Sequence, residues 1–171
     1  TVCELATAKD IQIRDKNEVP EIKKDVDDND RTVEIGQKLT YTITGKVPDY
    51  TGFTSYTYKV ADTMSEGLTF NQNSIKVTVG GVDKTADCTT EKNVGENANS
   101  FTVTIPVLDK KYTIGAEIKV TYSAVVNKQA VAKISSNEAK LTYSNDPTDS
   151  THTTTTPAQK QEVYSSKIVI D

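Results

Sequence analysis

The chain has 171 residues, a hydrophobic content of 35%, no tryptophan and a formal net charge of −4. This length suits one well-buried domain with an attached linker, and the many threonines and valines favour strands over helices. The sequence has no basic patch with interleaved aromatic residues and no apolar run near the ~18–20 residues that span a membrane. We therefore expect no nucleic-acid partner and no membrane insertion.

The polar residues 1–19 are expected to form an N-terminal strand or linker from an upstream domain, and a β-sandwich domain is predicted over 20–171. Its first strand is predicted at about 20–26. The acidic run 25–30 lacks the central glycine and the distant glutamate of a calcium loop. We interpret that run as a solvated turn, and we expect neither a metal nor a cofactor.

Alternation of apolar and polar residues, closed by turn residues, predicts the strands that follow. These strands lie at 39–44, 56–62, 75–79, 101–107, 118–126 and 137–143, and a final strand lies at 163–170. Gly80 and Gly81 indicate a hairpin. The remaining segments are predicted as an exposed loop at 83–100, one helical turn within 127–134 and a Thr-rich loop at 146–162. Many short strands without a long helical period indicate a β-sandwich.

Three of these strands place one polar residue on a face that otherwise consists of apolar residues. Lys24 lies in phase with Ile22 and Val26. Asp62 and Asn137 each fall in phase with the core residues of their own strands, which are Tyr56, Tyr58 and Val60 for Asp62, and Ala139, Leu141 and Tyr143 for Asn137. An amine, an acid and a carboxamide are the groups that an intramolecular isopeptide bond requires.

The chemistry of such a bond explains why these residues would be buried. Burial lowers the pKa of a lysine and raises that of an aspartic acid, so a proton can pass from Lys24 to Asp62. Neutral Lys24 then attacks the carboxamide of Asn137, Asp62 relays protons, and ammonia leaves. Proximity within the fold supplies much of the rate. The protein would be its own single-turnover catalyst.

Each residue also has an ordinary structural explanation. Lys24 could extend its amine to solvent at a strand edge, Asp62 could cap a turn, and Asn137 could bond the backbone at the start of a strand. The occurrence of all three together favours the crosslink. The competing residues are Lys23, which lies on the opposite face of its strand, and Asn145, which lies in turn sequence before a proline.

The same residues carry a family resemblance. Three motifs occur in order: Pro-x-Ile-x-Lys-x-Val at 20–26, Tyr-x-Tyr-x-Val-x-Asp-Thr-Met-Ser-x-Gly-Leu-Thr-Phe at 56–70, and Asn-x-Ala-x-Leu-x-Tyr-Ser-Asn-Asp-Pro at 137–147. The chain resembles the isopeptide-forming domain of Gram-positive, sortase-assembled fimbrial (pilus) backbone subunits. The resemblance implies an all-β, immunoglobulin-like sandwich of the collagen-adhesin A-type, with an Asp acid and a bond from the first strand to the penultimate one. The B-type alternative would use Glu and the last strand.

The resemblance also implies a function. It points to a structural module of an extracellular, cell-wall-anchored pilus shaft, in which a sortase joins neighbouring pilin subunits. The alternative is a ligand-binding module of a surface adhesin, which would contact a host surface ligand through the loops 50–53 and 83–100. A carbohydrate-binding sandwich is disfavoured by the absence of tryptophan. The only histidine, His152, lies in the Thr-rich loop, so we expect no turnover enzyme.

Two further features concern the context of the chain. It shows neither a signal segment nor a sorting signal, so we expect an internal piece of a longer protein. Cys3 and Cys88 have a spacing that suits no metal motif. We predict that they form a disulfide, because a secreted context permits one. The alternative is two free thiols.

Overall fold

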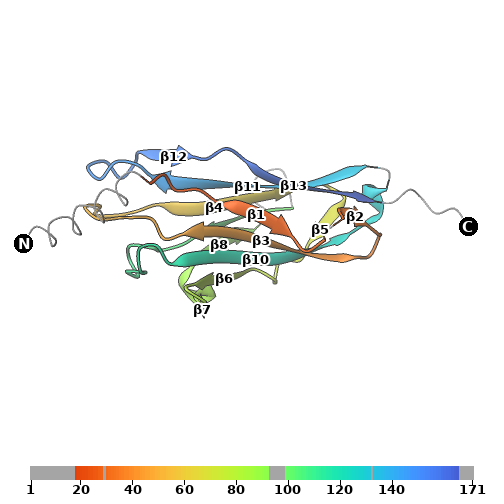
Figure 1. Ribbon diagram of the computed structural model, residues 1–171, viewed down its shortest axis with the longest axis horizontal. Helices are drawn as coiled ribbons and strands as arrows, with labels where there is room; N and C mark the ends of the chain where they lie inside the picture. Colours follow the sequence, from red (N-terminus) through yellow and green to blue (C-terminus); the bar gives the residue numbers. More distant parts are fainter. Residues whose placement is uncertain (1–17, 29, 93–98, 132, 166–171) are drawn as a thin grey trace, which may run out of the picture.

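The structure is a computed structural model that describes residues 18–28, 30–92, 99–131 and 133–165. These residues form two β-sheets that pack face to face along the long axis of the molecule (Figure 1). The predicted all-β, immunoglobulin-like sandwich is therefore confirmed. Residues 1–17 lie outside the described residues, so the division at residue 20 stays a prediction.

The first sheet contains the strand that carries Lys24. Its hydrogen-bonded order is β1 (Lys23–Val26), β3 (Lys38–Lys46), β10 (Glu117–Val126), β6 (Lys76–Val79) and β7 (Val82–Asp83), and β5 (Leu68–Phe70) also pairs with β10. All of these pairs are antiparallel. β1 lies at one end of this order, so Lys24 lies on an edge strand.

The second sheet contains the strands that carry Asp62 and Asn137. Its order is β2 (Thr32–Val33), β13 (Gln159–Ser165), β11 (Ile134–Ser144), β4 (Tyr58–Met64), β9 (Ser100–Thr104) and β8 (Thr89–Lys92), and β12 (Thr153–Thr155) also pairs with β11. β2 and β13 pair in parallel, and the other pairs are antiparallel. β4 and β11 are direct neighbours inside the sheet, so their inward side chains lie close together.

The core lies between the sheets and follows from strict alternation. Along β4 every second residue is buried, from Tyr58 to Met64. Three aromatic rings from both sheets meet at its centre. Phe101 lies against Tyr122 at a ring-centroid distance of 4.8 Å and against Phe70 at 5.1 Å. Full burial of one such apolar side chain stabilises the fold by roughly 1.5–3 kcal/mol. The buried hydrophobic side chains of the two sheets form one continuous core.

Several local predictions are confirmed. The hairpin at Gly80 and Gly81 joins β6 to β7, and both glycines have positive φ, 58° and 82°, as a tight hairpin turn requires. The helical turn predicted within 127–134 is the 3₁₀ turn η2 (Lys128–Ala130). The side chain of Asn127 caps this turn by accepting a hydrogen bond from the backbone N–H of Gln129.

Two predicted loops contain strands. The segment 83–100 holds the 3₁₀ turn η1 (Thr85–Asp87) and β8, so the prediction of one exposed loop there was wrong. The segment 146–162 contains β12 and the start of β13, and the final strand therefore begins before residue 163. β8 and β12 are short and largely exposed, so neither shows the apolar alternation that identifies a half-buried strand.

Candidate functional site

Lys24 is brought into the interior by the alternation of β1. Its neighbours Lys23 and Asp25 are exposed, whereas Lys24 retains only 4% of its accessible surface. It lies opposite Ile43 of β3, inside the sandwich. The competing residue Lys23 therefore faces solvent. Gln161 of β13 donates a hydrogen bond of 2.6 Å to the backbone carbonyl of Lys24, which ties this edge strand to the second sheet.

Asp62 and Asn137 lie diagonally across the β4–β11 pair. Asp62 lies opposite Ala139, and Asn137 lies opposite Met64. Residues two apart on a strand share a face, and a diagonal pair on neighbouring strands lies within reach of side chains. Asp62 retains 1% of its accessible surface and Asn137 retains 0%. The competing residue Asn145 is exposed, and its amide bonds the Thr154 hydroxyl.

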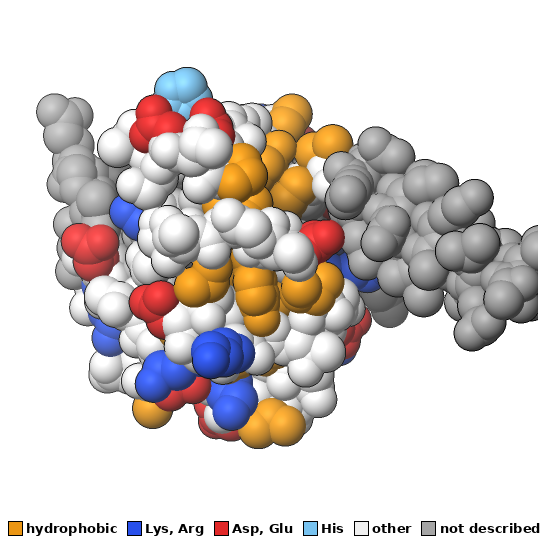
Figure 2. Space-filling model, turned by 90° about the vertical axis from the view of Figure 1, so that its left-hand side faces the viewer, with side chains coloured by type: hydrophobic (Ala, Val, Ile, Leu, Met, Phe, Trp, Pro, Cys, Tyr) orange, Lys and Arg blue, Asp and Glu red, His pale blue; other side chains and the backbone are white. Residues whose placement is uncertain are grey.

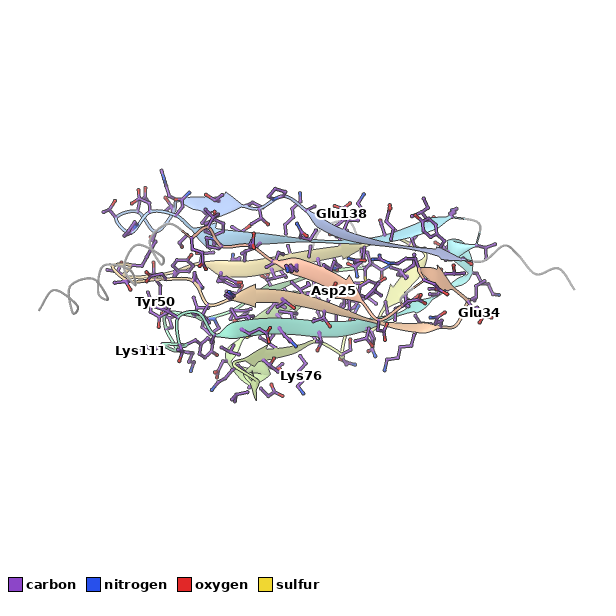
Figure 3. The ribbon with its side chains drawn as sticks, viewed as in Figure 1. Asp25, Glu34, Tyr50, Lys76, Lys111 and Glu138 are labelled. Atoms are coloured by element: carbon purple, nitrogen blue, oxygen red, sulfur yellow. The ribbon has the colours of Figure 1, made fainter. Side chains whose placement is uncertain are left out.

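The Lys24 amine crosses the interior to reach the opposite sheet. Its Nζ donates a hydrogen bond to Asp62 Oδ2, and the two form an ion pair whose side chains have no exposed surface. Figure 3 labels the next residues along, Asp25 on β1 and Glu138 on β11, near the middle of the long axis. The group therefore lies in the middle of the sandwich, far from either end.

Tyr122 of β10 completes the group, and sequence reasoning did not identify it. Its hydroxyl donates to Asp62 Oδ2, accepts from Lys24 Nζ, and accepts from Asn137 Nδ2 at 3.0 Å. A phenol hydroxyl has one donor and two acceptor positions, so this hydroxyl is fully used. The signal in the sequence was weak, because Tyr122 appeared only as one of several apolar residues in the alternation of 118–126.

Two tyrosine rings cover the amine. Tyr41 of β3 stacks on Tyr122 with ring centroids 5.6 Å apart, and Lys24 Nζ lies 5.4 Å from the Tyr41 centroid and 5.2 Å from that of Tyr122. Burial raises the pKa of the Tyr41 hydroxyl. Within the described residues, the Tyr41 hydroxyl and Asn137 Oδ1 are buried and neither has a hydrogen-bond partner. The ring of Tyr41 shields the amine from water.

Burial sets the electrostatics of the pair. It lowers the pKa of Lys24 from the ordinary 10.5, and the charge of Asp62 opposes this shift. It raises the pKa of Asp62 from the ordinary 3.8, and Lys24 and Tyr122 oppose that shift. Both shifts favour the neutral forms, which are a free amine and a protonated acid. In the described part of the chain Asp62 Oδ1 has no hydrogen-bond partner, so only one of the two carboxylate oxygens is engaged there.

Other predicted features lie elsewhere. Cys3 lies outside the described residues, so its pairing with Cys88 stays a prediction. Cys88 is half-buried, its Sγ lies 3.4 Å from the Lys84 carbonyl oxygen, and burial raises the pKa of its thiol to about 11. Among the residues that the structure describes, no group of His, Cys, Asp and Glu is placed to hold a metal ion. No helix in the same residues is long and apolar enough to cross a membrane.

The loop 50–53, a candidate ligand contact, lies at one end of the molecule. Figure 3 places Tyr50 and Lys111 at this end, and Figure 2 shows hydrophobic side chains gathered on it beside basic side chains. The Tyr50 hydroxyl donates to the Tyr112 carbonyl at 2.7 Å, and the rings of Phe53 and Tyr56 pack edge to face. These internal contacts account for the aromatic residues, and none of them identifies a ligand.

Comparison with known proteins places this geometry in a family. A family model described as Gram-positive pilin backbone subunit 2, Cna-B-like domain, matches residues 35–147. The trypsin-resistant surface T6 protein of Streptococcus pyogenes is 35% identical over 151 residues, which are 78% of this chain and 27% of that protein. The chain therefore spans about a quarter of that relative.

Solved structures agree. The T6 backbone pilin of serotype M6 Streptococcus pyogenes, described as a modular three-domain structure, aligns with a TM-score of 0.63 and 27% identity, covering 86% of this chain and 36% of that one. A fragment of the major pilin GBS80 of Streptococcus agalactiae aligns with a TM-score of 0.68 over 86% of this chain and 56% of that one. Its identity of 19% shows likeness of fold alone.

The family model and the sequence motifs point to different domain subtypes. The family model names a B-like domain, whereas the acid type and the position of Asn137 led us to predict the A-type. In the structure β12 and β13 follow the strand of Asn137, and Asp62 is the buried acid. The family itself is the same under either label: this chain belongs to the Gram-positive pilin backbone subunits and forms a structural module of the pilus shaft.

Proposed function

We propose that this module locks its two sheets together with an isopeptide bond between Lys24 Nζ and Asn137 Cγ. The observation that supports the proposal is the buried ion pair of Lys24 with Asp62, which Tyr122 links to the Asn137 carboxamide. Groups of this kind are rarely buried without a partner or a reaction. The proposal gives each of them a role.

The reaction begins with a proton transfer within the ion pair. Lys24 gives a proton to Asp62 Oδ2, which desolvation favours for both groups. The neutral amine attacks Asn137 Cγ, and ammonia leaves as the new C–N bond replaces the old one. Asp62 acts as the proton relay and contributes no atom to the product. Each molecule reacts once, so the protein is not a turnover enzyme.

The position of the bond suits a load-bearing role. Lys24 lies on β1 of the first sheet, and Asn137 lies on β11 of the second sheet. The described chain enters at one end of the long axis and leaves at the other (Figure 1). A pulling force along the chain would pass from residue 24 directly to residue 137. The strands between these positions would carry no load and could not be extended.

For the whole protein, we propose the role that the relatives suggest. Neighbouring pilin subunits would be joined by a sortase into an extracellular, cell-wall-anchored fibre. The structural neighbours include the major pilin RrgB of Streptococcus pneumoniae at 26% identity and the T6 backbone pilin of Streptococcus pyogenes at 27% identity. A host surface ligand for an adhesin role receives no specific support from the loop 50–53.

The mass of the intact folded chain tests the proposal. After reduction, the wild type should be lighter than its sequence mass by one ammonia, and digestion should yield a peptide pair joined through Lys24 and Asn137. The Lys24→Ala variant should keep its full sequence mass, and the matched variant Lys23→Ala should lose ammonia as the wild type does. A wild-type mass equal to the sequence mass would exclude the bond.

A further inference from the structure

We infer that Tyr122 is a catalytic residue of bond formation and passes a proton from Asp62 to the departing amine of Asn137. The inference rests on the proposed isopeptide bond and assigns a step that the bond requires. The amide nitrogen of Asn137 is a poor leaving group, because it must gain a proton before it departs as ammonia. Some group must supply that proton inside a dry core.

The hydrogen bonds identify the donor. Asn137 Nδ2 makes its hydrogen bond to the Tyr122 hydroxyl, at 3.0 Å. That hydroxyl in turn donates to Asp62 Oδ2, the oxygen that also receives the bond from Lys24. Within the described residues no hydrogen bond joins Asp62 directly to Asn137. The path from the acid to the leaving nitrogen therefore runs through Tyr122.

The hydroxyl also fixes which end of the carboxamide faces it. Its proton is committed to Asp62, so it can only accept from its other neighbours. The amide nitrogen of Asn137 donates and its oxygen cannot, so the leaving nitrogen lies against Tyr122. Asn137 Oδ1 has no hydrogen-bond partner among the residues that the structure describes. Tyr122 thus presents the Asn137 side chain to Lys24 in one orientation.

The proton count closes without any other reactant. Lys24 first gives one proton to Asp62 Oδ2, and its Nζ then forms a bond with Asn137 Cγ while the carbonyl electron pair moves to Oδ1. Nδ2 takes the Tyr122 proton as Tyr122 takes the proton of Asp62, and the Cγ–Nδ2 bond breaks as the carbonyl reforms. The second proton of Nζ then passes to Asp62. The products are the amide, ammonia and a protonated, neutral Asp62.

The relay must be concerted, and the surroundings of Tyr122 enforce this. Burial and the charge of Asp62 raise the pKa of its hydroxyl well above 10. A free phenolate is therefore too costly to form, and the hydroxyl gives one proton only as it receives another. After the reaction Lys24 is part of a neutral amide, so no positive charge remains beside Asp62 to favour its ionised form. The protonated, neutral acid is therefore the form that the apolar core favours.

The experiment compares two buried tyrosines. Tyr58 lies on β4, the strand of Asp62, and its hydroxyl lies against Gly45. No hydrogen bond connects it to Lys24, Asp62 or Asn137 within the described residues. Wild type, Tyr122→Phe and Tyr58→Phe chains would be unfolded, diluted into native buffer, and sampled over time by intact mass, with circular dichroism to follow folding. The starting material is unfolded inclusion-body protein of full sequence mass.

We expect Tyr58→Phe to lose ammonia at the wild-type rate and Tyr122→Phe to react at least about 100-fold more slowly after folding, as loss of a proton-transfer group does. Wild-type speed in Tyr122→Phe, or equal slowing of both variants, would overturn the inference. A wild type that never loses ammonia would instead refute the bond itself. If Tyr122→Phe does not fold, a fluorinated tyrosine at position 122 keeps the shape and changes the acidity. An altered rate would then support the relay, and an unchanged rate would overturn it.

Discussion

Lys24 and Asp62 form an ion pair that joins the two sheets, and neither side chain has any exposed surface. Desolvation offsets most of the attraction in such a pair, so a buried ion pair by itself is a weak source of stability. Conversion of Lys24 to an amide removes the charge of the amine, leaves Asp62 protonated and neutral, and adds a covalent bond between the two sheets. We therefore expect this site to stabilise the module through the covalent bond and not through the ion pair that precedes it.

The first prediction concerns the free energy of unfolding. The bond would close a loop of more than ~100 residues, which the chain-entropy model values at about 4–5 kcal/mol. Lys24→Ala should lower the free energy of unfolding by roughly that amount, and Lys23→Ala should change it by less than about 0.5 kcal/mol. Denaturant titration under reducing conditions measures both. A similar small change in the two variants would mean that Lys24 forms no crosslink.

Alternation in the sequence predicted the burial of Lys24, Asp62 and Asn137, because it determines which face of a strand each residue occupies. Lys24, Asp62 and Asn137 each stand in phase with apolar neighbours, and the structure brings the three together. Alternation does not determine which residue of the opposite sheet a buried side chain will touch. Tyr122 and Tyr41 were therefore grouped with the ordinary core, although one of them contacts all three residues.

The missed strands have a different cause. β8 and β12 lie at the margins of the second sheet, where both of their faces meet solvent. Their residues are mostly threonine and charged residues, so the sequence shows no buried face to detect. β2 and β13 pair in parallel across more than a hundred residues of chain. Such pairing depends on the finished sandwich and leaves no local signal in the sequence.

The second prediction concerns the cysteines. Cys3 and Cys88 should form a disulfide in protein made under oxidising conditions, because a secreted chain with two cysteines can join them at little cost. Thiol titration of the unfolded, unreduced chain should then find no free thiol, and the Cys88→Ser variant should show one. Two free thiols in the wild type would refute the pairing.

The third prediction concerns Gly45 of β3, where the core allows no side chain. A Cβ atom there would lie 2.5 Å from the Tyr58 hydroxyl, and its next contact would be Ile22 Cγ2 at 3.3 Å. Gly45→Ala should therefore destabilise the module by about 1–3 kcal/mol, the usual cost of overpacking. The clash depends mainly on one oxygen atom. Tyr58→Phe removes that atom, so Gly45→Ala should cost clearly less in the Tyr58→Phe background.

A double-mutant cycle of unfolding free energies measures this coupling. The double variant should be more stable than the sum of the two single effects predicts, because Tyr58→Phe removes the oxygen atom that the new methyl group of Gly45→Ala would meet. Additive effects of Gly45→Ala and Tyr58→Phe would show that the strand moves instead and that the Tyr58 hydroxyl is not the obstacle.

The fourth prediction concerns the pH dependence of bond formation. Before the reaction, Lys24 and Asp62 share one transferable proton, which either residue can carry. At low pH a second proton occupies Asp62, so Lys24 loses its base. Burial raises the pKa of Asp62, and this decline should begin above the ordinary 3.8. At high pH the pair loses its proton and no acid remains for the leaving amine. Burial lowers the pKa of Lys24, so this decline should begin below 10.5.

The rate of ammonia loss after refolding should therefore be bell-shaped in pH. Time courses of intact mass measure it, and circular dichroism at each pH confirms that folding is complete before the reaction. A rate that climbs steadily up to the pKa of an exposed lysine would contradict the paired mechanism.

The last prediction separates Asp62 as a proton relay from Asp62 as a structural residue. Asp62→Asn keeps the shape of the side chain and removes its ability to take a proton from Lys24. The variant should fold and keep its full sequence mass, because a charged amine cannot attack Asn137. Its free energy of unfolding should then fall to nearly that of Lys24→Ala. If Asp62 served only as a cap, the loss would be about 0.5–2 kcal/mol and the bond would still form.

Glu66 provides the matched control, because it is the nearest acid along the same motif. Its carboxylate pairs with Lys133 at 3.1 Å, and the Glu66 side chain is 67% exposed. It is too well solvated to share the buried proton of Lys24. Glu66→Ala should therefore lose ammonia as completely as the wild type, whereas Asp62→Asn should not. Complete crosslinking in Asp62→Asn would remove Asp62 from the mechanism, and loss of crosslinking in Glu66→Ala alone would transfer the role to an exposed acid.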